Sequence, residues 1–289
     1  MRVLVLGAGG QVGRAVAQAV PAGHEVIAST RADVDIGDAS AVGKAITEAA
    51  ADWVVNAGAY TAVDQAEDEP AKAAAINDAA VGVIAAGAAR AGSRVLHLST
   101  DFVFDGASSR AYLPSDKPNP LGVYAASKLA GEAKVLDGDC AGIVLRTAWV
   151  YAATGRNFVL TMLRLMRERE QVRVVGDQIG APSWAAGLAR AIWGLMDAGA
   201  GAGIYHWTDL GVASWYDFAV AIQEEALARS LLPRATAVVP IATADYPTRA
   251  RRPAFSVLDT SATRALLSAT AAVHWRVNLR KMLDELRAA

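Results

Sequence analysis

Short runs of aliphatic, often β-branched residues alternate along the first half of the chain with longer, alanine-rich segments. Apolar positions in the longer segments recur at helical spacing, so the alternation predicts βαβ units around a parallel sheet. We expect strands at Val3–Leu6, Glu25–Ala28, Trp53–Asn56, Arg94–Leu98 and Gly142–Arg146, and helices at Gln11–Val20, Ala39–Ala50, Ala71–Ala91 and Tyr124–Leu136. Residues 1–150 are therefore predicted to form an α/β domain of the doubly wound, Rossmann type.

The pattern loosens after Arg146, and prolines punctuate the stretch before the last helix. We expect helices at Asn157–Arg169, Trp184–Asp197, Ser214–Arg229 and Leu279–Arg287, and a strand at Val172–Val175. No linker rich in serine and glycine separates the two halves. Residues 151–289 are therefore predicted to be mainly a smaller lobe packed on the first domain, a place for the substrate, with segments able to return to the Rossmann sheet.

Composition narrows the class of partner. The 28 basic and 29 acidic side chains nearly cancel and form no block of like charge, which gives no sign of nucleic-acid binding. Cys140 is the only cysteine, so nothing ties the protein to an oxidising compartment. The apolar stretches are interrupted before they reach membrane-spanning length, as at Gly82 and Gly87. We expect a cytoplasmic protein, monomer or homodimer, without a nucleic-acid or membrane partner.

Three glycines, Gly7, Gly10 and Gly13, follow the first predicted strand directly and open the first helix. Glycines at this position let the backbone turn tightly and approach a pyrophosphate, whose charge then lies at the helix N-terminus. The alternative is an ordinary glycine-rich βα turn. The position between a strand and a helix favours dinucleotide binding.

The end of the second strand carries the segment Ser29, Thr30 and Arg31. An acidic residue there selects the ribose 2′-hydroxyl of NAD, whereas hydroxyls and a guanidinium suit a 2′-phosphate. The sequence therefore favours NADPH, with NADH as the alternative. A solvated arginine without a ligand is the other interpretation of Arg31.

Two further segments are predicted to line the path of the cofactor. Asp35 and Ile36 fit a loop over the adenine. The residues Ala57, Gly58 and Ala59 follow the third strand, and their small side chains leave room where the cofactor has to pass.

Tyr124 and Lys128 lie four residues apart at the start of a predicted helix, so their side chains share one face. A cation held close to a phenol lowers its pKa, and we expect Lys128 to act in this way on Tyr124, the proton donor to a developing alkoxide. Lys128 can also hold the nicotinamide ribose. Thr100 ends an earlier strand, and the carboxyl ends of parallel strands line the ligand crevice. The predicted catalytic residues are Thr100, Tyr124 and Lys128.

These motifs together resemble the extended short-chain dehydrogenase/reductase superfamily and, within it, the family of dTDP-4-dehydrorhamnose reductases. The resemblance covers nearly the whole chain and is most specific in the second half. The segments that carry it are GQVG at 10–13, NAGAYTAVDQAE at 56–67, STDFVFDG at 99–106, YAASKLAGE at 124–132, RTAWVY at 146–151, NFVLTMLRL at 157–165, DQIGAPS at 177–183 and YPTRARRPAFSVLDT at 246–260.

The resemblance implies NADPH-dependent reduction of the C4 ketone of dTDP-4-dehydro-β-L-rhamnose to dTDP-β-L-rhamnose. It further implies that Tyr124 donates the proton. The residues that it places at the cofactor are Gln11, Val12, Ala59 and Thr61, and those that it places at the sugar are Thr100, Asp101, Trp149 and Asn157. Phe102 departs from the family pattern, because many relatives carry tyrosine there.

A basic cluster near the C-terminus gains a role from this resemblance. Arg249, Arg251 and Arg252 offer planar guanidinium groups that pair well with a nucleotide diphosphate. We hypothesise that at least one of them binds the pyrophosphate of the substrate, with Arg249 and Arg252 as the leading candidates. A solvated basic loop is the alternative.

Some family members hold Mg²⁺ through acidic residues at a dimer interface, but this chain has Ala15, Ala185 and Ala186 in the corresponding segments. Glu285 alone would make a weak site, and the four histidines are scattered. We predict no functional metal. Two other functions stay open: a nucleotide-sugar epimerase or dehydratase of the same fold, and a non-catalytic NADP-binding regulatory subunit.

Overall fold

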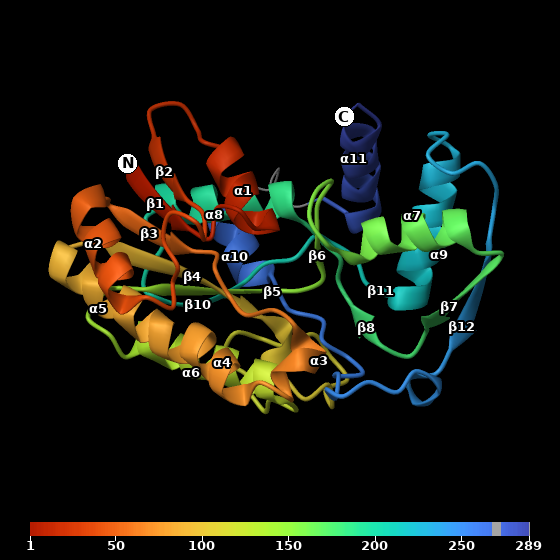
Figure 1. The fold of residues 1–289 in the computed structure, drawn as a ribbon, viewed down its shortest axis with the longest axis horizontal. Coiled ribbons are helices and arrows are strands. Elements are labelled where there is room, and N and C mark those ends of the chain that lie inside the picture. The colour runs from red at the N-terminus through yellow and green to blue at the C-terminus, as the bar shows by residue number, and fades with distance from the viewer. Residues whose placement is uncertain (268–272, 289) are drawn as a thin grey trace.

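The computed structural model describes residues 1–267 and 273–288, and its centre is a parallel sheet (Figure 1). Six strands in the described residues pair in the order β10-β5-β4-β3-β1-β2, and every pair is parallel. Their bounds are β1 Arg2–Leu6, β2 Glu25–Ser29, β3 Trp53–Asn56, β4 Arg94–Thr100, β5 Ile143–Thr147 and β10 Gly203–His206. The predicted doubly wound, Rossmann-type sheet is confirmed.

Helices cover both faces of this sheet because successive side chains of a buried strand point to opposite sides. Val3 and Val5 pack with residues of α8 (Ala185–Asp197), against which α1 (Gln11–Gln18) also lies. Leu4 and Leu6 pack on the other face, which is covered by α2 (Ala39–Ala49), α5 (Ala80–Ala91) and α6 (Val123–Leu136). The continuous apolar run of β1 is thus explained by burial on both sides.

The second half of the chain contributes to the first domain. Strand β10 pairs with β5 at the edge of the sheet, and α8 covers one face. The residues after 150 are therefore divided between the Rossmann sheet and a separate lobe.

That lobe lies beside the carboxyl ends of the strands (Figure 1). It consists of α7 (Phe158–Glu168), α9 (Trp215–Leu227) and α11 (Trp275–Ala288), with the parallel strands β7 (Gln171–Val175) and β12 (Ala237–Ile241). Its core is apolar and includes Phe218 and Leu279. The short pairs β6 (Val150–Tyr151) with β9 (Ser183–Trp184), and β8 (Ile179–Gly180) with β11 (Ala213–Ser214), connect it to the sheet domain. The remaining short elements are α3 (Val63–Ala66), α4 (Pro70–Ala74), the π-helical turn η1 (Ala75–Ala79), the 3₁₀ turns η2 (Asp101–Val103) and η3 (Thr243–Asp245), and α10 (Ser261–Leu266).

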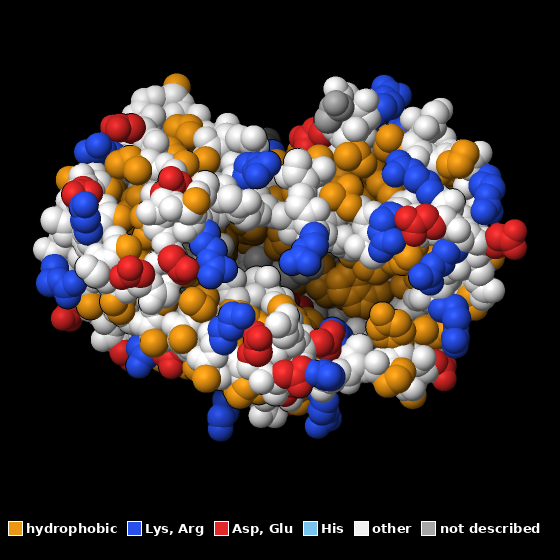
Figure 2. All heavy atoms as spheres, viewed as in Figure 1, with side chains coloured by type: hydrophobic (Ala, Val, Ile, Leu, Met, Phe, Trp, Pro, Cys, Tyr) orange, Lys and Arg blue, Asp and Glu red, His pale blue; other side chains and the backbone are white. Residues whose placement is uncertain are grey.

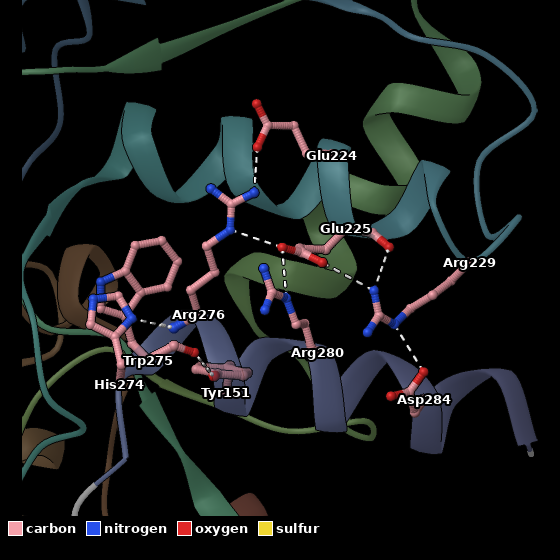
Figure 3. A network of polar contacts seen from close by, with 9 residues as sticks. All are labelled: Tyr151, Glu224, Glu225, Arg229, His274, Trp275, Arg276, Arg280 and Asp284. Atoms are coloured by element: carbon pink, nitrogen blue, oxygen red, sulfur yellow. Dashed lines mark hydrogen bonds and ion pairs between the residues drawn. The ribbon is translucent and has the colours of Figure 1, made fainter.

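A network around Glu225 joins α9 to α11 (Figure 3). The Glu225 carboxylate accepts hydrogen bonds from Arg276 at 2.8 Å, Arg280 at 2.9 Å and Arg229 at 3.1 Å. Burial raises the pKa of Glu225, but the hydrogen bonds from Arg276 and Arg280 outweigh it and the net pKa lies below the usual value. The carboxylate therefore stays ionised and ties the last helix to the lobe.

The helical run from Pro70 to Ala91 corrects one expectation. By length and composition alone it could cross a membrane, although the glycines within it were expected to prevent this. In the structure Val81, Ile84 and Ala88 are buried against the sheet core. A helix with a face buried in this way is part of the core of the sheet domain.

Candidate active site

The site lies where the carboxyl ends of β1, β3, β4 and β5 meet the second lobe. Figure 2 shows the surface hollowed between the two halves of the molecule, with hydrophobic side chains gathered on the side of the second lobe. This is the position at which parallel α/β sheets bind ligands.

The glycine turn after β1 has the geometry of a phosphate-binding loop. Gly7 adopts a φ of +80°, and a Cβ there would lie 2.6 Å from the backbone nitrogen of Gly58. A Cβ on Gly13 would overlap the carbonyl oxygen of Gly7. Gly10 is the N-cap of α1, and no side chain in the described part of the protein caps that helix. The free N–H groups and the close backbone approach fit a pyrophosphate at this helix end.

The end of β2 presents a guanidinium that already has a partner. Arg31 is largely exposed and lies 3.2 Å from the carboxylate of Asp35. A hydrogen bond from the Gly37 backbone, opposed by slight burial and supported by Arg31, lowers the pKa of Asp35. The hydroxyl of Thr30 donates to Asp33 at 2.7 Å, whereas Ser29 is buried at the strand end. A 2′-phosphate at Arg31 would therefore compete with Asp35.

The loop after β3 is held by two asparagines. Oδ1 of Asn56 accepts from the backbone N–H of Gly58 at 3.1 Å, and the side chain of Ile36 lies against Gly58 without room for a Cβ. Asn77, which the sequence analysis did not single out, exchanges two hydrogen bonds with the backbone of Tyr60 and donates to Ser127. It lies in η1, and π-helical turns are frequent at functional sites. A polar residue buried in an alanine-rich helix is the signal that could have found it.

The structure also places the other residues that were predicted to lie at the cofactor. Ala57 and Ala59 are partly buried, and Thr61 is exposed. Gln11 accepts a hydrogen bond from Asn157 at 2.9 Å, and Val12 packs against the core of the sheet.

Tyr124 and Thr100 lie close together near the start of α6, and Lys128 lies one turn further along the same helix. The Thr100 hydroxyl accepts from the backbone N–H of Phe102 and donates to Asp101, both at 3.1 Å. Burial raises the pKa of Tyr124 to about 12, although a hydrogen bond from Thr100 acts in the opposite direction. At neutral pH the phenol is protonated and can donate.

The expectation that Lys128 lowers the pKa of Tyr124 is wrong for this structure. Nζ of Lys128 turns towards the sheet, where it donates to the carbonyl oxygen of Leu98 at 2.6 Å and lies 3.1 Å from Nε2 of His97. Burial also lowers the pKa of Lys128 to about 8, despite the nearby charge of Glu132. The lysine therefore points to β4.

Asp101 is a second acid beside the phenol. Burial raises its pKa to about 7, against hydrogen bonds from Ser256 and Thr100 that lower it. One of its oxygens, Oδ2, has no hydrogen-bond partner among the described residues. An unpartnered buried oxygen at a ligand crevice suits a hydroxyl of a bound substrate.

Trp149 is held in a strained conformation at the other side of the crevice. Its φ is +47°, which is costly for a bulky residue and recurs at functional sites. Its indole stacks on Trp215, with ring centroids 3.5 Å apart and planes 6° from parallel. It also touches Gly180, where a Cβ would lie 2.6 Å from the ring. Neither Trp215 nor Gly180 could be linked to Trp149 from sequence spacing.

Asn157 has a structural task. Its Oδ1 accepts from the backbone N–H of Leu160 as the N-cap of α7, and Nδ2 donates to Gln11 and to the carbonyl oxygen of Ala152. The side chain thereby connects the second lobe to the glycine turn.

The basic cluster divides into two kinds of residue. Arg252 pairs with Asp64 at 2.7 Å, and Arg249 pairs with Asp68. Arg251 lines a small pocket beside Tyr124 and Phe102. Arg249 and Arg252 thus hold their loop to the segment around α3, and Arg251 is the arginine that faces the site.

Metal ligands do not gather in the described part of the chain. Across residues 1–267 and 273–288, no three His, Cys, Asp or Glu side chains are placed to hold an ion together. Burial raises the pKa of Glu285, which lies on α11.

Comparison with known proteins supplies the family. The family model described as RmlD substrate binding domain matches residues 1–288. The dTDP-4-dehydrorhamnose reductase of Burkholderia thailandensis is 43% identical over 272 residues, 91% of each chain. The structure is similar to that of a dTDP-4-dehydrorhamnose reductase from Clostridium acetobutylicum, with a TM-score of 0.92 and 34% identity over 99% of this chain and 100% of that one. A Bacillus anthracis dTDP-4-dehydrorhamnose reductase in complex with NADP gives a TM-score of 0.90 and 31% identity over 98% and 99%.

Proposed function

Because the chain belongs to the RmlD substrate binding domain family and is an oxidoreductase, we propose that it reduces the C4 ketone of dTDP-4-dehydro-β-L-rhamnose with NADPH. The product is dTDP-β-L-rhamnose. The observation that supports this proposal most is that Thr100, beside Tyr124, and the glycine turn follow parallel strands at the same edge of the sheet.

The residues present fit a dinucleotide. Gly7 and Gly13 leave the space that a pyrophosphate needs, and Arg31 with Thr30 lies where a 2′-phosphate would reach. NADPH, when bound, supplies the hydride that C4 accepts. The Bacillus anthracis relative was solved with NADP, which supports this choice of cofactor.

The chain's own residues perform the proton transfer and the orientation. Tyr124 donates its phenolic proton to the oxygen at C4 as that oxygen gains charge. The Thr100 hydroxyl, which donates to Asp101 in this structure, turns to donate its proton to the same oxygen when the ketone binds. Trp149, fixed by its stack on Trp215, supports one face of the sugar, and Oδ2 of Asp101 accepts from a sugar hydroxyl. Holding both reactants in one crevice removes much of the entropic barrier.

We assign the contact with the diphosphate to Arg251 instead of Arg249 or Arg252. It borders the pocket beside Tyr124, whereas Arg249 and Arg252 already bind carboxylates. A guanidinium at this place can pair with phosphate oxygens in a bidentate manner.

The test is NADPH oxidation by the purified protein with a panel of 4-keto nucleotide sugars. The reaction is followed by the absorbance of the reduced nicotinamide at 340 nm. We expect turnover with dTDP-4-dehydro-β-L-rhamnose and a slower rate with NADH. Absence of turnover with every ketone would overturn the reductase. Oxidised NAD that co-purifies with the protein and is retained through turnover would indicate an epimerase or dehydratase.

Gly180→Ala is expected to raise KM for the nucleotide sugar by about tenfold, because the new Cβ would lie 2.6 Å from the indole of Trp149 and displace it. Gly176→Ala is the matched control. A Cβ there has ordinary contacts, the nearest at 3.6 Å, and KM should not change. Equal KM values for the two variants would remove Trp149 from the sugar site.

A further inference from the structure

The helix that carries Tyr124 begins without a capping side chain of its own. Gly122 is the N-cap of α6 and has no side chain, and the first turn of the helix contains no acidic residue. The first four backbone N–H groups of a helix have no partner within the helix, and helix ends fray. Tyr124 is the second residue of α6, so it lies in the turn that frays first.

A carboxylate from a distant segment takes the place of the missing cap. The backbone N–H of Val123 donates to Oε1 of Glu67 at 2.8 Å, although the two residues are 56 positions apart in the chain. Glu67 is half-buried and lines the same small pocket as Gly122 and Tyr124. A negative charge at this place also suits the positive end of the helix dipole.

Gly122 is matched to this carboxylate. Its backbone is extended, with a φ of −150° and a ψ of 173°, and any residue adopts this conformation. The backbone therefore does not require glycine. A Cβ on Gly122, however, would lie 2.7 Å from Oε1 of Glu67. The missing side chain at the N-cap leaves the space that the Glu67 carboxylate fills.

The segment that carries Glu67 is held in place from its other side. Glu67 directly follows α3, in which Asp64 accepts hydrogen bonds from Arg252 at 2.7 and 3.1 Å. The backbone N–H of Ala250 donates to Asp64 as well, at 3.2 Å. Because α3 is anchored in this way, the Glu67 carboxylate is a fixed partner for the start of α6.

We propose that Glu67 is a positioning residue whose carboxylate caps α6 and thereby fixes Tyr124 where its phenol reaches the substrate oxygen. The effect on catalysis rests on the proposed function, in which Tyr124 is the proton donor, whereas the cap itself does not. A displacement of about 1 Å in an active site can cost about a hundredfold in rate, so a frayed first turn lowers kcat.

The first test is backbone amide hydrogen exchange in the ligand-free protein, which needs no substrate. We expect the Val123 amide to be protected in the wild type, although it has no acceptor within its own helix. Glu67→Ala should speed its exchange by about fivefold, the factor that corresponds to the loss of one cap. Free exchange of Val123 in the wild type, or equal rates in the two proteins, would refute the cap.

The second test is kcat at saturating NADPH. Glu67→Ala should lower kcat by about tenfold, because the first turn of α6 loses its partner. Glu67→Gln should stay within about threefold of the wild type, since an amide oxygen accepts the same N–H and only the charge is lost. A Gln variant as slow as the Ala variant would show that the hydrogen bond does not hold Tyr124.

Two variants of Gly122 differ by one oxygen atom and give the sharpest comparison. Both Gly122→Ala and Gly122→Ser place a Cβ against the Glu67 carboxylate and displace it. Only the serine hydroxyl can replace the lost cap, by accepting the N–H of Tyr124 or Ala125. Gly122→Ala should therefore lower kcat by about tenfold, and Gly122→Ser should stay within about threefold of the wild type.

The same logic applies to the double variant Glu67→Ala with Gly122→Ser. It should recover most of the kcat that Glu67→Ala loses, because the serine caps the helix without the carboxylate. Equal losses in Gly122→Ala and Gly122→Ser, or a double variant as slow as Glu67→Ala, would overturn the proposal. If Glu67→Ala does not fold, the wild-type exchange and the two Gly122 variants decide.

Asp259→Ala is the matched control for a purely structural effect. The Asp259 carboxylate also accepts an N–H at a helix start, from Ser261 of α10 at 2.8 Å, and α10 lies beside the edge strand β10. Its loss should leave kcat unchanged. A kcat of Glu67→Ala equal to that of Asp259→Ala would make Glu67 a structural residue only. If the wild type turns over no ketone, the proposed function fails, and amide exchange still decides whether Glu67 caps α6.

Discussion

Tyr124→Phe is expected to lower kcat for ketone reduction by about 10²- to 10⁴-fold, the usual contribution of a positioned general acid. The substitution removes only the hydroxyl. The ring keeps its edge-to-face contact with Phe102, with centroids 6.2 Å apart, so the fold should not change. Steady-state kinetics with NADPH and the dTDP-linked ketone measure the effect, and KM should change far less than kcat.

Tyr205→Phe is the control for this experiment, because its hydroxyl donates to the Gly201 carbonyl oxygen at the far edge of the sheet. It should retain the wild-type rate. The pH dependence adds a second criterion. The pKa of Tyr124 is raised to about 12, so the donor remains protonated as pH rises through neutrality and the rate should persist. A loss of rate with a midpoint near pH 7 would identify Asp101, whose pKa is about 7, as the acid instead.

The fold could be predicted because its signal is local. Burial on both faces makes β1 a continuous apolar run, and the alternation of such runs with helical segments is typical of a parallel sheet. Strand ends then place Gly7 and Thr100 at one edge without further information. Strand β10 escaped prediction because Gly203–His206 is only four residues long and pairs with β5, a segment far away in the chain.

The sequence predicts which residues belong to the candidate site, but not which contacts they make. The four-residue spacing of Tyr124 and Lys128 fixes a shared helix face, but the lysine side chain is long enough to choose between the phenol and β4. What decides is His97, thirty-one positions earlier, whose buried acceptor and donor atoms are unknown from sequence. The stack of Trp149 on Trp215 is likewise a product of the tertiary fold.

Arg146→Met is expected to lower the free energy of unfolding by about 3–5 kcal/mol, because it leaves the Glu132 carboxylate buried without its cation. Arg146 and Glu132 are each 1% exposed, and three hydrogen bonds of 2.6–3.2 Å join them. The hydroxyl of Ser99 donates to the same carboxylate at 2.5 Å but cannot neutralise it. Urea denaturation followed by circular dichroism measures the loss, read as a lower midpoint with an unchanged slope.

The double variant Glu132→Leu with Arg146→Met separates the charge from the packing. It removes both ions and fills their space with apolar atoms. It should therefore be more stable than Arg146→Met alone, although it carries two substitutions instead of one. Arg164→Met is the surface control. Its pair with Glu168 on α7 is more than half exposed on both sides, with side chains 60% and 52% accessible, and its loss should cost about 0–1 kcal/mol. A double variant as unstable as the sum of the two single ones would mean that shape, and not the unpaired charge, makes this position critical.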